Sequence, residues 1–169
     1  TAQVAALGTA QVQSLSASTI KALTTGQVAA LTTGQVAGLT TTQVAGLSST
    51  QLNALSSTQV RAFSPDQVQV ITLSKFSTSQ MPNLSAAEVQ AFTSTQLNAL
   101  AASNTSVLQT IDATNLKGLT ATAVGGLSST ALTNLSSTQV KALTASQIQS
   151  LSTAQLRQLD TTQVSYLDT

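Results

Sequence analysis

Few residues in this chain could carry out chemistry. It contains no His and no Cys, which removes imidazole bases, the commonest nitrogen ligands for metals, thiolate nucleophiles and disulfides. The Ser and Thr hydroxyls are numerous, but no base is present to activate one as a nucleophile. Gly-rich phosphate loops and calcium-binding motifs are also missing from the sequence. We therefore predict no catalytic, cofactor-binding or metal site, and no enzymatic activity.

The carboxylates are the one set of groups that could still form an acid–base pair, as in glycoside hydrolases. There are five, scattered singly along the chain: Asp66, Glu88, Asp112, Asp160 and Asp168. The first four fall at positions where a helix would begin, and Asp168 falls at the same position of an incomplete last repeat. Carboxylates at helix starts are accounted for by capping and by the helix dipole. We interpret all five as structural.

The charge pattern excludes several kinds of partner. Charged residues make up 7% of the chain, against about 25% in typical domains. The net charge is +1 and the six Lys and Arg residues are isolated, so no nucleic-acid surface is predicted. No apolar run approaches the roughly 18 residues of a membrane span, so no membrane insertion is expected. The chain begins at Thr1 without a visible signal peptide, and we expect it to be processed, excised or part of a longer protein.

Internal repetition dominates the sequence. It reads TAQVAALG, TAQVQSLS, ASTIKALT, TGQVAALT, TGQVAGLT and onward to SYLDT, with a period of eight and the consensus [ST]-x-Q-[VIL]-x-[AG]-L-[ST]. The register breaks at 72–76, where one unit is shortened to five residues, and at 101–103, where three residues are inserted. Both breaks preserve the flanking pattern. Residues 1–169 are therefore interpreted as a single array of about twenty octads.

An eight-residue period does not suit one long helix. The apolar positions drift by about 80° per octad at 3.6 residues per turn, and a heptad coiled coil fails for the same reason. Strict alternation is absent too, because Val4 and Leu7 are three residues apart. Disorder is disfavoured, since 41% of the residues are hydrophobic and they recur at fixed spacing.

Local signals instead predict one short helix in each octad. In the segment 63–68, Ser64 is a favourable N-cap, Pro65 suits the first helical position, Asp66 suits the positive helix end, and Gln67 completes a capping box. Phe63 and Val68 would form a hydrophobic staple across this start. Segments 84–89 and 159–164 repeat the pattern. Each octad is therefore predicted to begin a helix, continue it for one or two turns and begin another.

Such units must stack, because isolated helices shorter than about 12–15 residues are marginal in water. We predict an all-α solenoid or superhelix stabilised by interfaces between repeats, with a β-solenoid as the alternative. The interior should contain the octads' aliphatic residues, and Ser, Thr, Gln and Ala should form the surface. The expected interior begins with Val4, Leu7, Val12, Leu15, Val28, Leu31, Val36 and Leu39.

Three other residue patterns carry predictions. A small residue before the last Leu of many octads, as in Gly38 and Gly126, should allow close backbone approach, and glycine there could help the chain turn. The recurrent Gln is interpreted as a cap, with a second possible role in amide hydrogen bonds between adjacent repeats. The aromatic residues near the irregular stretch are interpreted as packing rather than binding features, and Tyr166 as a terminal contact or as a residue without a role; the three Phe are Phe63, Phe76 and Phe92.

The tract LTTGQVAGLTTTQVAGLSSTQ resembles the Leu-[Ser/Thr]-x-x-Gln-Val octad arrays of very large bacterial proteins. Those proteins are often predicted to be exported surface or adhesin-like molecules. The resemblance covers essentially the whole chain and implies a repeat array at the cell surface or outside the cell. It carries no functional residue over to this sequence.

Three functions are compatible with these observations. The leading hypothesis is a structural subunit or segment of an extracellular filament, sheath or adhesin stalk, because the first and last octads are as apolar as the middle ones. It implies self-association, end to end or lateral, or further repeats of the same parent chain. The alternatives are an ice- or lattice-binding protein with regular Thr rows, and a protein-binding solenoid scaffold, which would need exposed anchors that are rare here.

Overall fold

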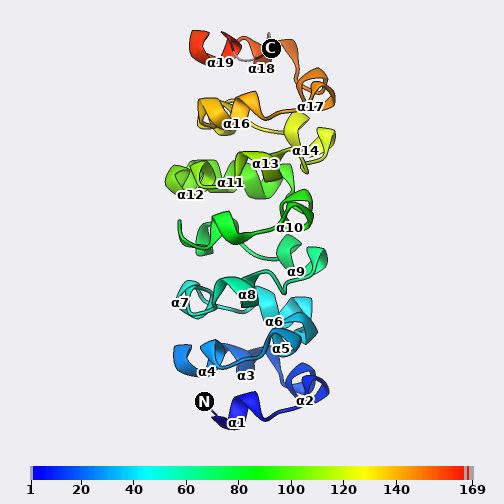
Figure 1. Cartoon of the computed structure of the whole chain (residues 1–169), viewed down its shortest axis with the longest axis vertical. Helices are drawn as coiled ribbons and strands as arrows, with labels where there is room; N and C mark the ends of the chain where they lie inside the picture. Colours follow the sequence, from blue (N-terminus) through cyan, green and yellow to red (C-terminus); the bar gives the residue numbers. More distant parts are fainter. Residues whose placement is uncertain (1, 166, 168–169) are drawn as a thin grey trace.

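A computed structural model describes residues 2–165 and 167, and it shows a rod of short helices wound into a stacked superhelix (Figure 1). Within the described residues there is no β-strand, and the ordered elements are nineteen short α-helices and two 3₁₀ helices. The all-α solenoid predicted from the octad pattern is confirmed, and the alternative β-solenoid is wrong. The first and last helices lie at opposite ends of the rod (Figure 1).

Almost every octad forms one helix of four to six residues. The elements, in chain order, are α1 (Ala2–Ala5), α2 (Thr9–Ser14), α3 (Ala17–Lys21), α4 (Thr25–Ala29), α5 (Thr33–Gly38), α6 (Thr41–Ala45), α7 (Ser49–Asn53), α8 (Ser57–Val60), α9 (Pro65–Gln69), η1 (Leu73–Lys75), η2 (Met81–Asn83), α10 (Ala86–Gln90), α11 (Ser94–Ser103), α12 (Thr105–Gln109), α13 (Ala113–Leu116), α14 (Ala121–Gly125), α15 (Ser129–Thr133), α16 (Ser137–Lys141), α17 (Ala145–Gln149), α18 (Thr153–Leu156) and α19 (Thr161–Ser165).

The helix starts are capped as the sequence predicts. At α9, the Ser64 hydroxyl accepts from the Gln67 backbone N–H at 3.3 Å, and the Gln67 side chain accepts from the Ser64 N–H at 2.7 Å. Pro65 occupies the first turn, where its missing N–H costs nothing. The same reciprocal capping box recurs along the chain, for example at Thr40 and Ser136. These caps satisfy backbone donors that a short helix cannot pair internally.

The helix ends have a simple cause. The N-cap residue of nearly every octad adopts extended backbone, such as φ −70° and ψ 156° at Thr40, and this interrupts the preceding helix after little more than one turn. Gln80 before η2 and Asn104 before α12 are exceptions. No described residue, glycine included, has a positive φ. The expectation that glycine helps the chain to turn is therefore wrong. The chain turns through ordinary extended residues at the octad boundaries.

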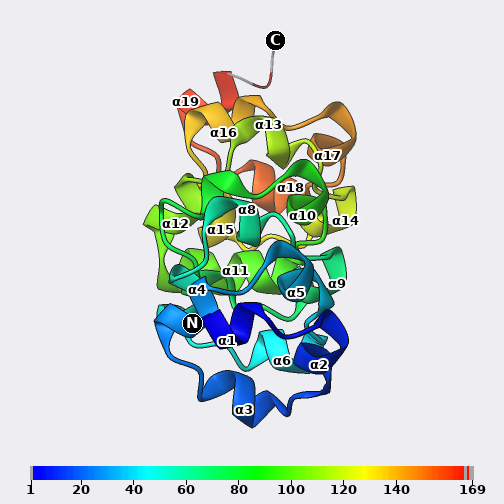
Figure 2. The same ribbon diagram turned by 60° about the horizontal axis from the view of Figure 1, so that its bottom comes forward.

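Successive turns of the superhelix stack directly on one another. Helix α2 packs against α5, α3 against α6, α4 against α7, and α14 against α17. Figure 2, which brings the N-terminal end forward, shows the short helices arranged around a common axis. Each octad is therefore supported by an octad that lies about one superhelical turn away, in addition to its neighbours in sequence.

The core of the rod is built from the aliphatic residues of the octads, as predicted. Val28 and Val36 are fully buried, and Leu31 and Leu39 are 4% exposed. The first and last turns differ because each has a neighbouring turn on one side only. Several of their aliphatic residues are only partly buried: Val4, Leu7, Leu15 and Leu23 near the N-terminus, and Leu143, Ile148, Leu156 and Leu167 near the C-terminus.

The two register breaks are absorbed without dividing the rod. The shortened unit forms η1, which packs against both α7 and α11, so the stack continues through it. The insertion at 101–103 lengthens one helix, and α11 reaches ten residues. Phe63, Phe76 and Phe92 are all buried around this irregular stretch, which confirms their interpretation as packing residues.

Glycines mark the closest contacts between turns. A Cβ on Gly126 would lie 2.7 Å from the Ser94 Oγ, and one on Gly38 would collide with the Thr9 side chain. A Cβ on Gly125 would lie 2.7 Å from the main-chain oxygen of Ser150, which cannot move independently of α17. The prediction that the small residue before the last Leu permits close approach is therefore confirmed at Gly38 and Gly126.

We predict that Gly125→Ala lowers the stability of the rod by about 1–3 kcal/mol, since the new methyl group would push α14 and α17 apart. The matched control is Gly34→Ala, whose Cβ would meet its nearest neighbour at 3.9 Å. That change should stabilise α5 by up to about 1 kcal/mol through helix propensity. Urea unfolding followed by circular dichroism measures both, and equal effects of the two changes would contradict the close-contact argument.

Candidate functional site

The most distinctive polar arrangement of the molecule is formed by the Gln at the third helical position of each octad. Both ends of its amide are used. At Gln43, the Oε1 atom accepts from the Thr40 backbone N–H at 2.8 Å, which caps its own helix. The Nε2 atom donates to the carbonyls of Val12 at 3.0 Å and Leu15 at 2.7 Å, which lie in the preceding superhelical turn. One side chain therefore serves the start of one helix and the end of another.

This arrangement is repeated along both halves of the rod, and we call it the glutamine ladder. In its regular part each Gln donates to the carbonyl of the Leu located 28 residues earlier, as Gln35 does to Leu7 at 2.7 Å. Sequence analysis considered amide bonds between adjacent repeats, but the bonds join octads more than three repeats apart. The rungs are Gln35, Gln43, Gln51, Gln59, Gln67, Gln80, Gln96, Gln139, Gln147, Gln155 and Gln163.

The ladder glutamines lie inside the rod, which corrects the expectation that Gln belongs to the surface. Gln43 and Gln139 are each 1% exposed, and most other rungs are buried as well. Burial of an amide is costly unless its donors and acceptor are paired, and here they are. Glutamines at other octad positions, such as Gln13 and Gln90, are exposed as predicted.

Two substitutions at the ladder position keep a donor. In the shortened unit, Lys75 extends its Nζ to the carbonyls of Ala45 at 3.3 Å and Leu47 at 2.7 Å. In α13, Asn115 donates to the Leu84 carbonyl at 2.8 Å. Side chains other than Gln can therefore serve at this position when they carry a donor that reaches the carbonyl ends of the preceding turn.

The ladder position lacks a side-chain donor in α12, α14 and α15, where it is Val107, Ala123 and Ala131. For Ala131 the structure supplies a reason, because α15 packs on α11 and Ala131 lies 31 residues after Leu100, the offset at which Gln139 reaches Leu108. Because α11 continues for ten residues, its middle carbonyls accept hydrogen bonds from its own backbone. Asn98 of α11 bonds in the opposite direction, donating to the Gly126 carbonyl at 3.0 Å and accepting from the Ser128 N–H at 2.7 Å.

The predicted carboxylates are placed at separate helix starts. Asp66 lies in the first turn of α9. Asp112 accepts from the Thr114 N–H at 2.8 Å, and Asp160 from the Gln163 N–H at 2.7 Å. Within residues 2–165 and 167, no three acidic residues gather into a possible metal site. Asp168 and Tyr166 lie outside the described residues.

Glu88 differs from the other carboxylates, and sequence analysis missed the difference. Its Oε2 accepts from the Ser85 N–H at 2.7 Å, which is the predicted capping role. The side chain is 2% exposed and its Oε1 atom, which occupies the place of the ladder amide nitrogen, has no hydrogen-bond partner. Burial raises the pKa of this carboxyl, while its hydrogen bonds to Ser85 and the charge of Arg61 act in the opposite direction.

The ladder is unfinished at both ends of the described rod, and the two ends are chemically complementary. In the first turn, Gln11 and Gln27 use Oε1 to cap their own helices at 2.7 and 2.8 Å. Among the described residues, their Nε2 atoms have no carbonyl of an earlier turn to which they can donate. In the last described turn, three leucine carbonyls are equivalent to those that accept ladder amides elsewhere: Leu143, Leu151 and Leu159. None of them accepts a hydrogen bond from a ladder amide among the described residues.

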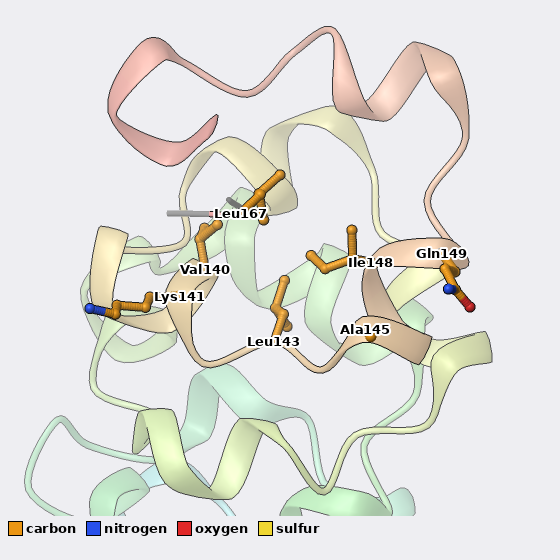
Figure 3. Close-up of a pocket in the computed structure, with 7 residues that line it drawn as sticks. All are labelled: Val140, Lys141, Leu143, Ala145, Ile148, Gln149 and Leu167. Atoms are coloured by element: carbon orange, nitrogen blue, oxygen red, sulfur yellow. The ribbon is translucent and has the colours of Figure 1, made fainter. Parts of the chain in front are cut away.

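The C-terminal end also contains an apolar hollow. A cavity of about 540 Å³ lies between α16, α17 and Leu167. Figure 3 shows the side chains of Val140, Leu143 and Ile148 directed toward this space, together with Leu167. The interior of the rod is much tighter, since the cavity lined by Leu97, Leu108 and their neighbours measures about 10 Å³. A second open hollow, of about 430 Å³, lies beside the shortened unit in the middle of the rod, between α9, η1 and α11.

These features define a class: a repeat protein of the short-helix α-solenoid type, held together by packing and by a hydrogen-bond ladder. The ALTTAQ repeat family matches residues 4–41, 19–49 and 36–73 of the chain, in overlapping tandem segments. These matches support a repeat array over the first 73 residues. No curated relative and no solved structure matches the chain. Among the described residues, no helix has both the length and the apolarity needed to cross a bilayer.

We predict that Gln51→Met lowers the stability of the rod by about 1–3 kcal/mol. Methionine has similar length but no amide. The carbonyls of Ile20 and Leu23 would lose their donor, and the Ser48 N–H would lose the acceptor that completes the capping box. Gln13→Met changes an exposed glutamine in α2 in the same way and should have little effect. Chemical unfolding of the two variants, compared with the unchanged chain, would contradict the role of the ladder if both behaved alike.

Proposed function

We propose that this protein is a non-enzymatic structural element that forms or extends a rod, as a subunit or segment of a filament, sheath or stalk. The observation that supports the proposal is the complementarity of the two ends. One end carries the unused amide donors of Gln11 and Gln27, and the other carries the unused carbonyls of Leu143, Leu151 and Leu159. The occupant that fits each end is a further turn of this same octad solenoid.

The proposed junction uses the interactions that already join the turns inside the rod. The amides of Gln11 and Gln27 take the role that Gln43 has toward Leu15. Apolar contact accompanies these bonds, because the partly buried residues Leu7 and Leu15 face one end and Leu143 and Ile148 the other. Burying aliphatic side chains contributes about 25 cal/mol per Å² of apolar surface removed from water. A second copy therefore gains the same kind of packing as an internal turn.

The sides of the rod support a structural rather than a recognition role. Exposed positions are dominated by Ser, Thr, Ala and Gln, with Val70 and Val164 as the large aliphatic exceptions in the described part. Binding hot spots are enriched in Trp, Tyr and Arg, and the sequence contains no Trp, one Tyr and few charges. The four described carboxylates all serve helix starts, which supports the non-enzymatic assignment.

We further propose that the rod acts at the cell surface or outside the cell. The support comes from the resemblance to octad arrays in large bacterial surface proteins, and from the absence of Cys, which leaves no thiol to oxidise in such a compartment. Fractionation of the source cells, followed by detection of the chain in the medium, envelope and cytoplasm, tests this part. Recovery confined to the cytoplasm contradicts it.

The end-to-end junction predicts concentration-dependent association that one double variant should abolish. Gln11→Glu with Gln27→Glu keeps an oxygen to cap each helix but removes both amide donors and places negative charge against the partner's carbonyls. We expect the unchanged chain to lengthen into linear oligomers as its concentration rises, and the double variant to remain monomeric. Sedimentation velocity gives the mass, and electron microscopy gives the shape.

The matched control is Gln13→Glu with Gln90→Glu, which adds the same charge at exposed positions that belong to no ladder rung. This control should associate like the unchanged chain. If the unchanged chain is monomeric at every concentration tested, or if both double variants associate equally, the proposed junction is wrong.

A further inference from the structure

The middle of the rod contains a ladder position occupied by a carboxyl group instead of an amide donor. Glu88 is the only glutamate in the sequence, and it occupies the third helical position of α10, just after the irregular segment that holds η1 and η2. Its Oε2 caps the helix through the Ser85 N–H at 2.7 Å. Its Oε1 is buried without a hydrogen-bond partner, the only buried side-chain nitrogen or oxygen in this condition among the described residues.

The neighbouring rungs indicate what Oε1 faces. Gln80 donates to the carbonyls 28 and 25 residues earlier, those of Leu52 and Leu55, at 2.8 and 3.1 Å. Gln96 does the same at these offsets, to Val68 at 3.0 Å and Ile71 at 2.9 Å. Glu88 lies midway between Gln80 and Gln96 in the sequence, and the same offsets place the carbonyls of Val60 and Phe63 opposite it.

A carboxylate cannot serve at such a position. Backbone carbonyls only accept hydrogen bonds, and an ionised carboxylate also only accepts, so two acceptors would meet in a site without solvent. The facing carbonyls belong to the C-terminal end of α8, where the helix dipole disfavours negative charge. Lys75, which replaces Gln in the neighbouring unit, also acts as a donor, since its Nζ bonds the Leu47 carbonyl at 2.7 Å. A neutral carboxylic acid meets this requirement because its O–H donates.

We propose that Glu88 is a proton-binding rung of the ladder: as a carboxylic acid it donates from Oε1 to the preceding turn, and as a carboxylate it leaves that bond unmade. Proton binding then closes the junction between α10 and the turn that contains α8, and proton loss opens it. The rod thus has one joint whose strength depends on pH, at its centre and independent of its ends. This inference does not rest on the proposed end-to-end association.

The charged groups near this rung are few. Arg61, which follows α8, donates from Nε to the Asn83 carbonyl at 2.8 Å, and its charge lowers the pKa of Glu88. The helices packed against α10 contribute Asp66 from α9, and Asp112 and Lys117 from the two ends of α13. Burial is the largest influence, and it raises the pKa of Glu88 above the ordinary value of a glutamate.

The direction of the pH dependence follows from this raised pKa. A group that binds its proton more tightly in the folded state than in the unfolded state stabilises the fold fully below its unfolded pKa. That stabilisation is lost as the pH rises through the folded pKa. The rung should therefore be strongest in acid and weakest at neutral pH and above. The capping aspartates have no such donor role. Comparing the pH dependence of stability of the unchanged chain with that of Glu88→Gln separates the contribution of Glu88 from theirs.

The first test is direct, because one glutamate gives one signal. In the full chain labelled with ¹³C-glutamate, the Glu88 carboxyl carbon should titrate by NMR with a midpoint above the ordinary pKa of glutamate. Gln90→Glu adds an exposed glutamate on the same helix as an internal reference, and its signal should titrate near the ordinary value for glutamate, about 4.3. A Glu88 midpoint at or below that of residue 90 would overturn the proposal.

The second test separates a proton-dependent rung from a merely tolerated glutamate. Glu88→Gln installs the usual ladder amide, so its urea midpoint should exceed that of the unchanged chain at neutral pH, and the difference should shrink in acid. Gln139→Glu converts a regular rung, whose Nε2 bonds Leu108 at 3.0 Å and Ile111 at 2.9 Å, and should acquire the same pH-dependent loss. The proposal is contradicted if the stability difference between Glu88→Gln and the unchanged chain stays constant with pH. It is also contradicted if the Gln139→Glu variant is as stable as the unchanged chain at neutral pH.

Discussion

A helix of about five residues consists almost entirely of ends, and this constraint shapes the whole molecule. The first four N–H groups and the last four carbonyls of any helix have no partner within it, so most of the backbone polar groups in these octads need partners elsewhere. The glutamine ladder satisfies groups of both kinds with one side chain. Oε1 takes a backbone N–H at the start of its own helix, and Nε2 supplies carbonyls at the end of another, as Gln43 does for Thr40 and Leu15. The rod is possible because these bonds can be made between stacked turns.

The same constraint explains where the repeat departs from its consensus. Where α11 continues for ten residues, its carbonyls pair internally, as Leu100 does with the Asn104 N–H, and α15, which packs on α11, carries Ala131 at the ladder position. Where the unit is shortened, Lys75 spans the altered distance with a longer side chain. Asn115, whose side chain is shorter than that of Gln, also donates to a carbonyl of the preceding turn. These exceptions are correlated with the local geometry of the preceding turn, which indicates that the donor requirement belongs to the stack rather than to the octad.

A stack of this type is nearly one-dimensional, because each turn contacts only the turns next to it. Its stability is a sum of similar junctions, and a single altered rung acts locally. Glu88 is such a rung. Each end turn presents half of a junction, with amide donors at one end of the rod and carbonyl acceptors at the other. The proposed growth of the rod and the proposed pH sensitivity of its central joint therefore rest on the same interaction.

The octad sequence alone determined the secondary structure, the capping boxes, the aliphatic core and the all-α solenoid class, because all of these depend on residues within eight positions of each other. Ser64, Pro65 and Gln67 specify a helix start without reference to anything distant. The number of octads per turn could not be predicted, since it depends on the small angles between successive helices. For that reason the burial of Gln43 and Gln139, the partners 28 to 31 residues away and the isolated oxygen of Glu88 were decided by the tertiary structure. The role of a ladder residue depends on which carbonyls of the preceding turn lie opposite it. The octad pattern alone does not specify those carbonyls.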